Sequence, residues 1–401
     1  MSGIEFGNPF RPGAGHMPPH LAGRQPEIAE FQRLLSQETI LENMVLTGLR
    51  GVGKTVLLET FRPLAISEGW GWVGTDLSES TSISEDRVAL RVMTDLAVVT
   101  SSIEVSSREV SALGFGAERK LVTQKLTFDT MAQLYNGTPG LVADKLKAVL
   151  EFVWECWRQR GKQGLIFAYD ESQTLSDHAS KDEYPLSLLL DVFQSIQRKG
   201  IPFMLVLVGL PTLFPKLVEA RTFAERMFRV VFLDRLNKSD SREAVLKPIE
   251  DNRCPVTLED TSVRRITEAS GGYPYFIQFI CKEAYDVFLQ KIDASEKPSI
   301  PIKEIIHKLD SDFFAGRWAR ATDRQRELLT VIAALDNCEY EFTVQELAEK
   351  SKEMLEKPFS PSHVNQMLVT LGNVGLIYKN RHGKYSFAVP LLGQFISRQQ
   401  Q

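Results

Sequence analysis

An α/β fold, with a parallel sheet covered by helices on both faces, is what the sequence predicts for its first two thirds. Short apolar stretches alternate there with amphipathic helical patterns. Strands that are apolar on both sides are typical of a parallel sheet buried between helices. The five expected strands are Met44–Thr47, Trp70–Leu77, Leu165–Tyr169, Phe203–Val208 and Val230–Leu233.

Helical patterns fill the spaces between these strands. Apolar residues recur at helical spacing, and another helix is expected directly after a glycine-rich loop at residues 48–55. Residues 100–140 mix serine and glycine with alternating stretches, which predicts a β-hairpin insertion. The four further helices are expected at residues 25–35, 85–99, 141–159 and 186–199.

Two mainly helical units follow the sheet. The first contains three helical patterns, at residues 239–251, 258–269 and 275–292. In the second, three helical patterns precede two strands around Arg381-His382-Gly383, which is the element order of a winged helix-turn-helix. The expected organisation is an irregular arm, a sheet domain, a helical lid and a winged helix, at residues 1–20, 21–236, 237–295 and 320–401.

The composition is that of a globular protein. The 401 residues are 43% hydrophobic and 24% charged, with a formal net charge of −4. This charge argues against unspecific nucleic-acid binding over the whole surface, but it is compatible with a local basic face. The four cysteines contain no CxxC pair, so neither a zinc site nor a disulfide framework is expected. Without an apolar run of ~20 residues or a signal-peptide core, a cytoplasmic protein is expected.

A glycine-rich loop directly follows the first expected strand. Residues 48–55, GLRGVGKT, match the motif GxxxxGK[ST] in full. Backbone N–H groups of such a loop surround a phosphate closely, which needs glycine, and the following helix N-terminus favours negative charge. The lysine is expected to contact the β- and γ-phosphates, and the threonine hydroxyl is expected to bind Mg²⁺. The predicted phosphate-site residues are Gly48, Gly51, Val52, Gly53, Lys54, Thr55 and Val56.

Two acidic residues end the buried strand Leu165–Tyr169. Asp170 is expected to hold Mg²⁺ through water, and Glu171 is expected to polarise the attacking water as general base. The alternative is that these acids only cap a following helix. The glycine-rich loop favours the catalytic interpretation, because a phosphate site of this kind needs a second carboxylate on the magnesium side.

Phosphoryl transfer also needs a cation near the γ-phosphate. Arg226 ends a helix just before the fifth expected strand, where an arginine can project to a neighbouring subunit as an arginine finger. The alternatives are a salt bridge that involves the adjacent Glu225, or a solvated arginine. Arg221 is the other candidate for this catalytic role.

These motifs together resemble those of AAA-type ATPases close to the origin-recognition initiators and the archaeal and bacterial ATPases grouped with them. The resemblance covers about residues 18–290 and implies that the nucleotide is ATP, bound with Mg²⁺ and hydrolysed. In that family the segment before the loop packs on the adenine, which implies this role for Leu21, Gly23 and Arg24. The motifs that carry the resemblance are LAGRxxEI at 21–28, the loop, the Asp-Glu pair, AERxF at 224–228 and GYP at 272–274.

Two departures from the family concern the γ-phosphate. The glycine pair at 271–272 precedes Tyr273 and Pro274, which suggests a helix-capping turn that either faces the nucleotide or is purely structural. No arginine stands at this turn. The strand tip where the family often places a polar sensor is Gly209, which leaves only Thr212. Hydrolysis is therefore expected to be slow or partner-dependent, as in signalling or accessory members rather than replication initiators.

The C-terminal unit carries a basic end. Residues 360–398 contain four basic and no acidic residues. The wing tip can follow a phosphate backbone or enter a minor groove, and the start of the third helix can reach base edges. Over residues 320–401, however, ten basic residues face nine acidic ones, which is a small excess for DNA binding. The candidate DNA-binding residues are His363, Asn365, Lys379, Arg381 and Lys384.

Three functions are compatible with these observations. The first is an ATP-hydrolysing switch that couples its nucleotide state to homo-oligomer assembly and to double-stranded DNA through the winged helix. The second is a regulatory signalling or defence-type ATPase whose winged helix binds a protein effector. The third is an ATP-binding scaffold with negligible turnover, against which the Asp170-Glu171 pair argues.

Overall fold

The structure is a computed structural model, and it describes residues 7–13, 15–108, 121–254, 256–293, 300–381 and 383–400. Contacts between Cα atoms divide the chain into two compact units. We call Gln25–Thr47 with Leu57–Phe232 the sheet unit, and Met1–Arg24 with Gly48–Val56 and Leu233–Gln401 the lid unit. Each unit is described by itself.

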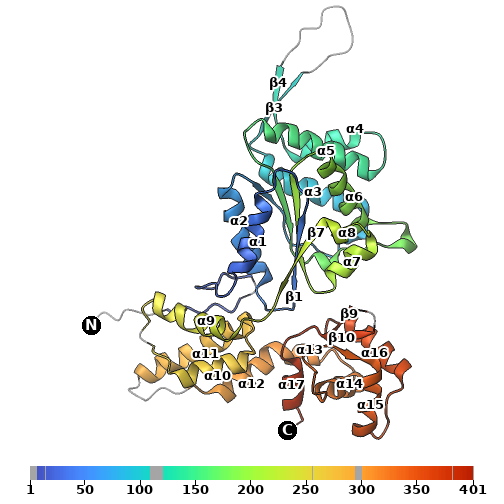
Figure 1. Ribbon diagram of the computed structural model, residues 1–401. Helices are drawn as coiled ribbons and strands as arrows, with labels where there is room; N and C mark the ends of the chain where they lie inside the picture. The colour runs from blue at the N-terminus through green and yellow to red at the C-terminus, as the bar shows by residue number, and fades with distance from the viewer. Residues whose placement is uncertain are drawn as a thin grey trace, which may run out of the picture. The chain divides into compact units, whose positions relative to one another are not determined.

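A five-stranded sheet forms the centre of the sheet unit (Figure 1). Its order is β2–β5–β6–β1–β7, and the pairs β2–β5, β5–β6 and β6–β1 are parallel. Strands β1, β5 and β6 are buried along their whole length because their apolar side chains are covered on both faces. The strands are β1 Asn43–Gly48, β2 Gly71–Val73, β5 Leu165–Tyr169, β6 Phe203–Gly209 and β7 Phe228–Leu233. The predicted parallel sheet is confirmed, and only β2 is much shorter than expected.

The register of the parallel strands defines two edges of the sheet. Thr47 of β1 lies beside Gly209 of β6, and Tyr169 of β5 lies beside Leu207 of β6. The carboxyl ends of these three strands therefore meet at one edge, which we call the carboxyl edge. The chain leaves β1 for the glycine-rich loop and β5 for the Asp-Glu pair at this same edge. The opposite edge, where β1 begins at Asn43, is called the amino edge.

Helices cover both faces of this sheet. Figure 1 shows α1 and α2 on one face and α3, α5 and α6 on the other. Phe31 of α1 stacks on Phe61 of α2 at 4.2 Å between ring centroids, while Phe193 of α6 contacts Phe167 of β5 edge-on at 4.9 Å. The predicted helices are α1 Gln25–Leu35, α2 Lys54–Ser67, α3 Glu85–Thr100, α5 Val142–Arg158 and α6 Pro185–Arg198.

The sheet unit also contains a second strand pair and several short helices. Within the segment expected to form a β-hairpin, β3 Glu104–Arg108 and β4 Leu121–Lys125 pair antiparallel, and the residues between them lie outside the described residues. The same segment also contains a helix, α4 Phe128–Gly137. The remaining short elements are η1 Thr81–Ile83, η2 Ser172–Thr174, η3 Ala179–Lys181, α7 Leu213–Ala220 and α8 Ala224–Met227.

The lid unit contains the predicted helical lid and the C-terminal elements. Lid helices α9 Lys238–Asp251, α10 Asp260–Ser270 and α11 Pro274–Asp293 agree with the sequence patterns. A connecting segment follows, made of α12 Ile302–Leu309, the π-helical turn η4 Asp310–Ala315 and α13 Gly316–Trp318. One hydrophobic core runs from the lid into the C-terminal elements, with Phe314 stacked on Phe395 at 5.1 Å.

The C-terminal elements have the order expected of a winged helix. Helices α14, α15 and α16 precede the strand pair β9 and β10, and β8 completes an antiparallel sheet of order β8–β10–β9. The bounds are α14 Asp323–Ala333, β8 Phe342–Thr343, α15 Val344–Met354, α16 Pro361–Asn373, β9 Ile377–Arg381, β10 Lys384–Phe387 and α17 Leu392–Arg398. In the parts of the chain that the structure describes, no helix is long and apolar enough to span a membrane.

Candidate nucleotide site

The glycine-rich loop closes around its own lysine. The loop leaves β1 at Gly48 and ends at Lys54, the first residue of α2. Gly51 and Gly53 have φ values of 79° and 91°, which are the left-handed conformations that favour glycine. The Nζ atom of Lys54 donates hydrogen bonds to the carbonyl oxygens of Gly48 and Leu49, both at 2.9 Å. The ammonium group therefore lies against the loop backbone, beside the place where the motif predicts phosphate.

Two of the loop glycines are closely packed. A Cβ atom at Gly48 would collide with the carbonyl oxygen of Leu233, and one at Gly51 would come within 3.1 Å of Cβ of Tyr275. At Gly53 an added Cβ would meet no described atom within 4 Å. Gly48 thus needs glycine for packing inside the lid unit, Gly51 combines a close contact with a left-handed backbone, and Gly53 needs glycine for its backbone conformation alone.

The segment before the loop forms hydrogen bonds with both the loop and the start of the lid. Arg24 is 5% exposed, and its Nη2 atom donates to the carbonyl oxygens of Val52 and Asp234, both at 2.9 Å. Gly23 has φ 64°, and a Cβ atom there would collide with the carboxylate of Asp240. The guanidinium group of Arg24 therefore fixes the backbone of the loop at Val52. The predicted adenine contacts of Leu21, Gly23 and Arg24 stay predictions.

The helix that follows the glycine pair of the lid contacts the loop. Gly271 ends α10 with φ 58°, and the carbonyl oxygen of Gly272 accepts a hydrogen bond of 2.8 Å from the backbone N–H of Leu236. Helix α11 then begins at Pro274, and the N–H of Tyr275 donates to the carbonyl oxygen of Gly51 at 3.1 Å. The turn with Tyr273 and Pro274 is thus next to the loop. Burial raises the pKa of Tyr273 to about 12, so its phenol stays neutral at physiological pH.

The two predicted carboxylates lie at the carboxyl edge of the sheet unit. Asp170 is 5% exposed, and its Oδ1 atom accepts a hydrogen bond of 2.7 Å from the backbone N–H of Glu171. Its own backbone pairs with the segment after β2, through hydrogen bonds with Thr75 and Leu77 of 3.2 and 2.9 Å. Glu171 is exposed and adopts φ 52°, an unusual conformation for a residue with a side chain.

The structure adds a residue that the sequence patterns missed. The Nε2 atom of Gln173 donates to Oε2 of Glu171, and its Oε1 atom accepts from the N–H of Leu210 at 3.1 Å. This amide therefore occupies the tip of β6, where Thr212 was the sequence candidate for a polar group. Thr212 precedes α7 and makes no capping hydrogen bond through its side chain. A glutamine two positions after the acidic pair was the only sequence signal, and it does not reveal the contact with β6.

A half-buried lysine supports the turn that carries this glutamine. The Nζ atom of Lys216 donates to the carbonyl oxygens of Gln173 and Leu175 at 2.6 and 3.2 Å, and to Oγ of Ser176 at 2.7 Å. Burial lowers the pKa of Lys216. Since an ammonium group has three N–H donors, these contacts use all of them. The turn after Glu171 is thus attached to α7.

Arg226, the predicted arginine finger, lies at the amino edge. It belongs to α8, directly before β7, and it is exposed. The next residue, Met227, accepts a hydrogen bond of 3.2 Å through its carbonyl oxygen from Nδ2 of Asn43, the first residue of β1. Arg221, the other candidate, forms a bidentate ion pair with Asp191 at 2.8 and 2.6 Å. Arg226 is therefore the better placed of the two for a contact outside this chain.

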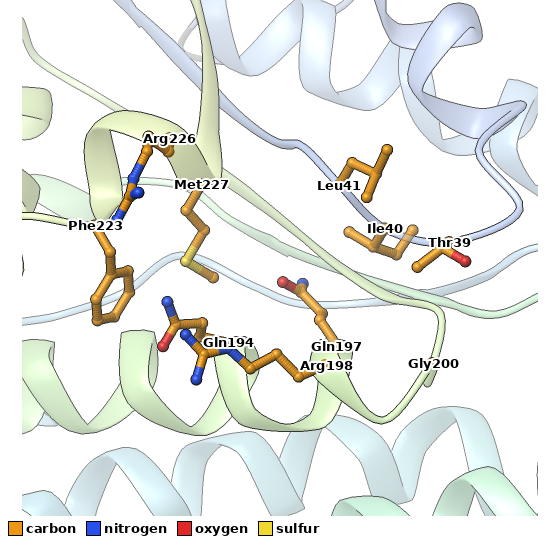
Figure 2. A pocket seen from close by; sticks show the side chains of 10 residues that line it. All are labelled: Thr39, Ile40, Leu41, Gln194, Gln197, Arg198, Gly200, Phe223, Arg226 and Met227. Carbon is orange, nitrogen blue, oxygen red and sulfur yellow. The ribbon is translucent and has the colours of Figure 1, made fainter.

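Arg226 is one of the residues that line a pocket of about 510 Å³. Figure 2 shows the guanidinium groups of Arg198 and Arg226 on the side of the pocket where Gln194 and Phe223 lie. Among the described residues, neither arginine forms an ion pair. The lining residues are Thr39, Ile40, Leu41, Gln194, Gln197, Arg198, Gly200, Phe223, Arg226 and Met227.

The basic residues of the winged helix are partly neutralised. Arg381 pairs with Glu341 at 2.7 Å and Arg398 pairs with Asp310 at 2.6 Å, and both acids lie outside residues 360–398. Of the four basic residues in that span, Lys379 and Lys384 form no ion pair within the described part of the chain.

The candidate base-reading residues differ in accessibility. Oδ1 of Asn365 accepts a hydrogen bond of 3.0 Å from the hydroxyl of Tyr385, whereas His363 is exposed beside Phe359. The amide oxygen of Asn365 is therefore already engaged within the fold. His382 of the wing tip lies outside the described residues.

Comparison with known proteins identifies the fold. A Walker-type ATPase from Pyrococcus abyssi is similar, with a TM-score of 0.57 and 14% sequence identity over 94% of this chain and 96% of that chain. The ORC1 protein of Aeropyrum pernix, solved with DNA, gives a TM-score of 0.45 and 14% identity over 95% and 94%. Cdc6p from Pyrobaculum aerophilum gives 0.45 and 13% over 97% and 98%. The two lower TM-scores carry no conclusion. The first similarity, with the strand order, shows an AAA-like P-loop nucleoside-triphosphatase fold, as the sequence predicted.

Sequence comparison is less informative. A family described as a domain of unknown function, DUF8462, matches residues 311–396, which correspond to the C-terminal elements. No curated protein sequence matches the chain.

Proposed function

We propose that the protein binds ATP with Mg²⁺ and hydrolyses it as a molecular switch. The observation that carries this proposal is the strand order. Strand β1, which leads into the complete phosphate-binding motif, ends at the same edge as β5, which leads into Asp170 and Glu171, and only β6 lies between them. The chain thus leaves the sheet for the phosphate-binding motif and for the acidic pair at the same edge, as expected for a site that hydrolyses ATP.

The chain supplies a group for each step. The backbone N–H groups of the loop and the ammonium of Lys54 bind the β- and γ-phosphates. The hydroxyl of Thr55 and the carboxylate of Asp170 are hard oxygen donors of the kind that Mg²⁺ prefers, and the ion would neutralise phosphate charge. Glu171 accepts the proton of the attacking water. The adenine is held by the segment with Leu21, Gly23 and Arg24 and by the lid turn with Tyr273 and Pro274.

Replacement of the general base tests the hydrolytic part of this proposal. In Glu171→Gln, phosphate release should fall about 10²- to 10⁴-fold, the usual contribution of a general base. The dissociation constant of ATP should stay within about twofold, because the phosphate-binding loop is unchanged. Glu68→Gln, at an exposed carboxylate outside the site, is the control. Equal turnover in wild type and Glu171→Gln would instead support an ATP-binding scaffold.

We further propose that Arg226 acts on the ATP of a second copy of this chain. Strand β1 has 6 residues, and at about 3.3 Å per residue it separates the two edges of the sheet by about 20 Å. An arginine side chain at the amino edge cannot cover that distance to the carboxyl edge of its own sheet. A second copy that brings its amino edge to this carboxyl edge would supply the missing cation, so the complete site is assigned to a homo-oligomer.

For the winged helix we propose association with double-stranded DNA through Lys379, Lys384 and His363, with smaller contributions from Arg381 and Asn365. Each phosphate contact should contribute about one unit to the dependence of log affinity on log salt. The double variant Lys379→Ala/Lys384→Ala should therefore lower this slope by about two. Arg381→Ala should have a smaller effect, because Glu341 already neutralises this arginine. Lys352→Ala, at an exposed lysine of α15, is the control.

A protein effector is the second candidate for the winged helix. The ion pairs of Arg381 and Arg398 favour it, because they remove two of the charges that DNA would neutralise. Absence of DNA binding by wild type at about 0.1 M salt, where screening is near physiological, would decide for this candidate. A salt slope unchanged in the double lysine variant would also contradict the proposed DNA face.

A further inference from the structure

We propose that Gln173 is a positioning residue that holds the carboxylate of Glu171 against the tip of β6. This inference rests on the proposed hydrolysis of ATP, and it names a residue through which the general base is oriented. It explains how the site works although the tip of β6 is a glycine and Thr212 stands at the start of a helix.

Both ends of the Gln173 amide are engaged. Its donor end binds Oε2 of Glu171, and its acceptor end takes the backbone N–H of Leu210 at 3.1 Å. Glu171 is exposed, so without this contact its side chain would rotate among several conformers. Because Leu210 directly follows β6, the amide fixes the carboxylate relative to a strand of the central sheet rather than to a surface loop.

Residues on both sides of Gln173 hold its amide in this place. A Cβ atom at Gly209 would approach Oε1 of Gln173 to 2.6 Å, so a larger residue at the strand tip would displace the amide from this place. On the other side, Lys216 donates to the carbonyl oxygen of Gln173 at 2.6 Å. Both the side chain and the backbone of Gln173 are therefore held by neighbouring elements.

The strand that Gln173 contacts is the neighbour of the strand that leads into the phosphate-binding loop. Gly209 of β6 lies beside Thr47 of β1, the residue directly before Gly48. The position of the general base is thus set by the same strand pair that sets where the loop begins. Loss of the amide should misplace the base without changing how the loop binds phosphate.

Two substitutions test the hydrogen bonds at the two ends of the Gln173 amide. Gln173→Ala removes both contacts. Gln173→Glu keeps an acceptor for Leu210, but it has no donor for Glu171 and places a second carboxylate against it. In both variants kcat should fall about 10- to 100-fold, the cost of a base displaced by about 1 Å. The dissociation constant of ATP and the midpoint of thermal unfolding should stay close to wild type in Gln173→Glu, and Gln163→Ala, at an exposed amide, is the control.

A double-mutant cycle tests whether Gln173 acts through Glu171. In the Glu171→Gln background, Gln173→Ala should cause no further loss of single-turnover rate, because the carboxylate that it positions is gone. An equal loss in both backgrounds would overturn the proposal. Gly209→Ala, which leaves Gln173 in the chain but takes its space, should reproduce the loss of kcat.

The outcomes distinguish this inference from the function on which it rests. If wild type does not hydrolyse ATP, the proposed function fails and this inference fails with it. If wild type hydrolyses ATP and Gln173→Ala does so equally fast, only the positioning role is wrong. If kcat falls while ATP affinity falls in parallel, Gln173 supports the fold of the site rather than its base, and the inference is also wrong.

Discussion

The two edges of the central sheet differ in how their charged groups are held. At the carboxyl edge, Asp170 and Glu171 are fixed by hydrogen bonds from the backbone and from Gln173. At the amino edge, Arg198 and Arg226 line a pocket and form no ion pair in the described part of the chain. The acids thus form hydrogen bonds within the chain, whereas the two arginines form no ion pair among the described residues. Opposite charges at opposite ends of the same strands agree with the proposal that the site is completed between copies.

Buried hydrogen bonds hold the amino edge of the sheet together. Asn43 is 1% exposed, and its amide exchanges hydrogen bonds of 3.2 and 2.8 Å with the amide of Gln197. Its Oδ1 atom also accepts from the N–H of Leu205 at 2.7 Å, and its Nδ2 atom reaches the carbonyl oxygen of Met227. The buried amide pair thus joins β1, α6, β6 and Met227, the residue next to the exposed Arg226.

The largest effect is expected at the amino edge. Arg226→Ala should lower ATP turnover about 10³-fold or more, as arginine fingers do, with ATP affinity nearly unchanged. Mixing it with Lys54→Ala should restore part of the turnover, because the Lys54→Ala copy still supplies Arg226 to an intact site. Steady-state phosphate release of the single variants and of the mixture measures this. A mixture no more active than its components would mean that the two edges do not meet between copies.

A smaller effect is expected for Lys54→Ala, in the phosphate-binding loop. Loss of a charged hydrogen-bonding partner costs about 2–5 kcal/mol, so ATP affinity should fall by about 30-fold to a few thousandfold. Isothermal titration with ATP and Mg²⁺ measures the dissociation constant. Lys162→Ala, an exposed lysine before β5, should bind ATP as wild type does. Unchanged affinity in Lys54→Ala would place the nucleotide elsewhere and remove the basis of the comparison.

The smallest effect on activity, but a clear one on stability, is expected for Asn43→Ala. The substitution leaves buried hydrogen-bonding groups of Gln197, Leu205 and Met227 without their partner, at about 1–3 kcal/mol for each group that water cannot reach. We expect the free energy of unfolding to fall by about 3 kcal/mol and ATP affinity to change less than twofold. Urea unfolding and ATP titration measure the two quantities. Full stability in Asn43→Ala would show that the amino edge is not held by this network.

Most of the sheet could be predicted from the sequence, because buried parallel strands are continuous apolar runs. The strand Leu165–Tyr169 was predicted to the residue, and the complete phosphate-binding motif located the loop. Helix α4 was missed because serine, glycine and alternating residues surround it, and the eight-residue α7 was missed because it is short. Two-residue β8 carries no periodic signal at all.

The parts of the site that the sequence could not predict are contacts between distant segments. Gln173 reaches Leu210 across 37 positions, and Arg381 reaches Glu341 across 40. Neither pair has a spacing that a helix or strand period would indicate, since each depends on which strands become neighbours. A charge count over residues 360–398 therefore overestimated the basic character of the wing.

The backbone of Glu171 has a consequence for how this protein would evolve. A left-handed conformation at a residue with a side chain costs about 1 kcal/mol, and glycine would relieve it. Glu171→Gly should therefore gain about 0.5–1 kcal/mol in conformational preference while removing the proposed general base. A search for heat-resistant variants, made without a screen for turnover, would then tend to remove this carboxylate. Retention of glutamate there would mark lineages in which hydrolysis still matters to the cell.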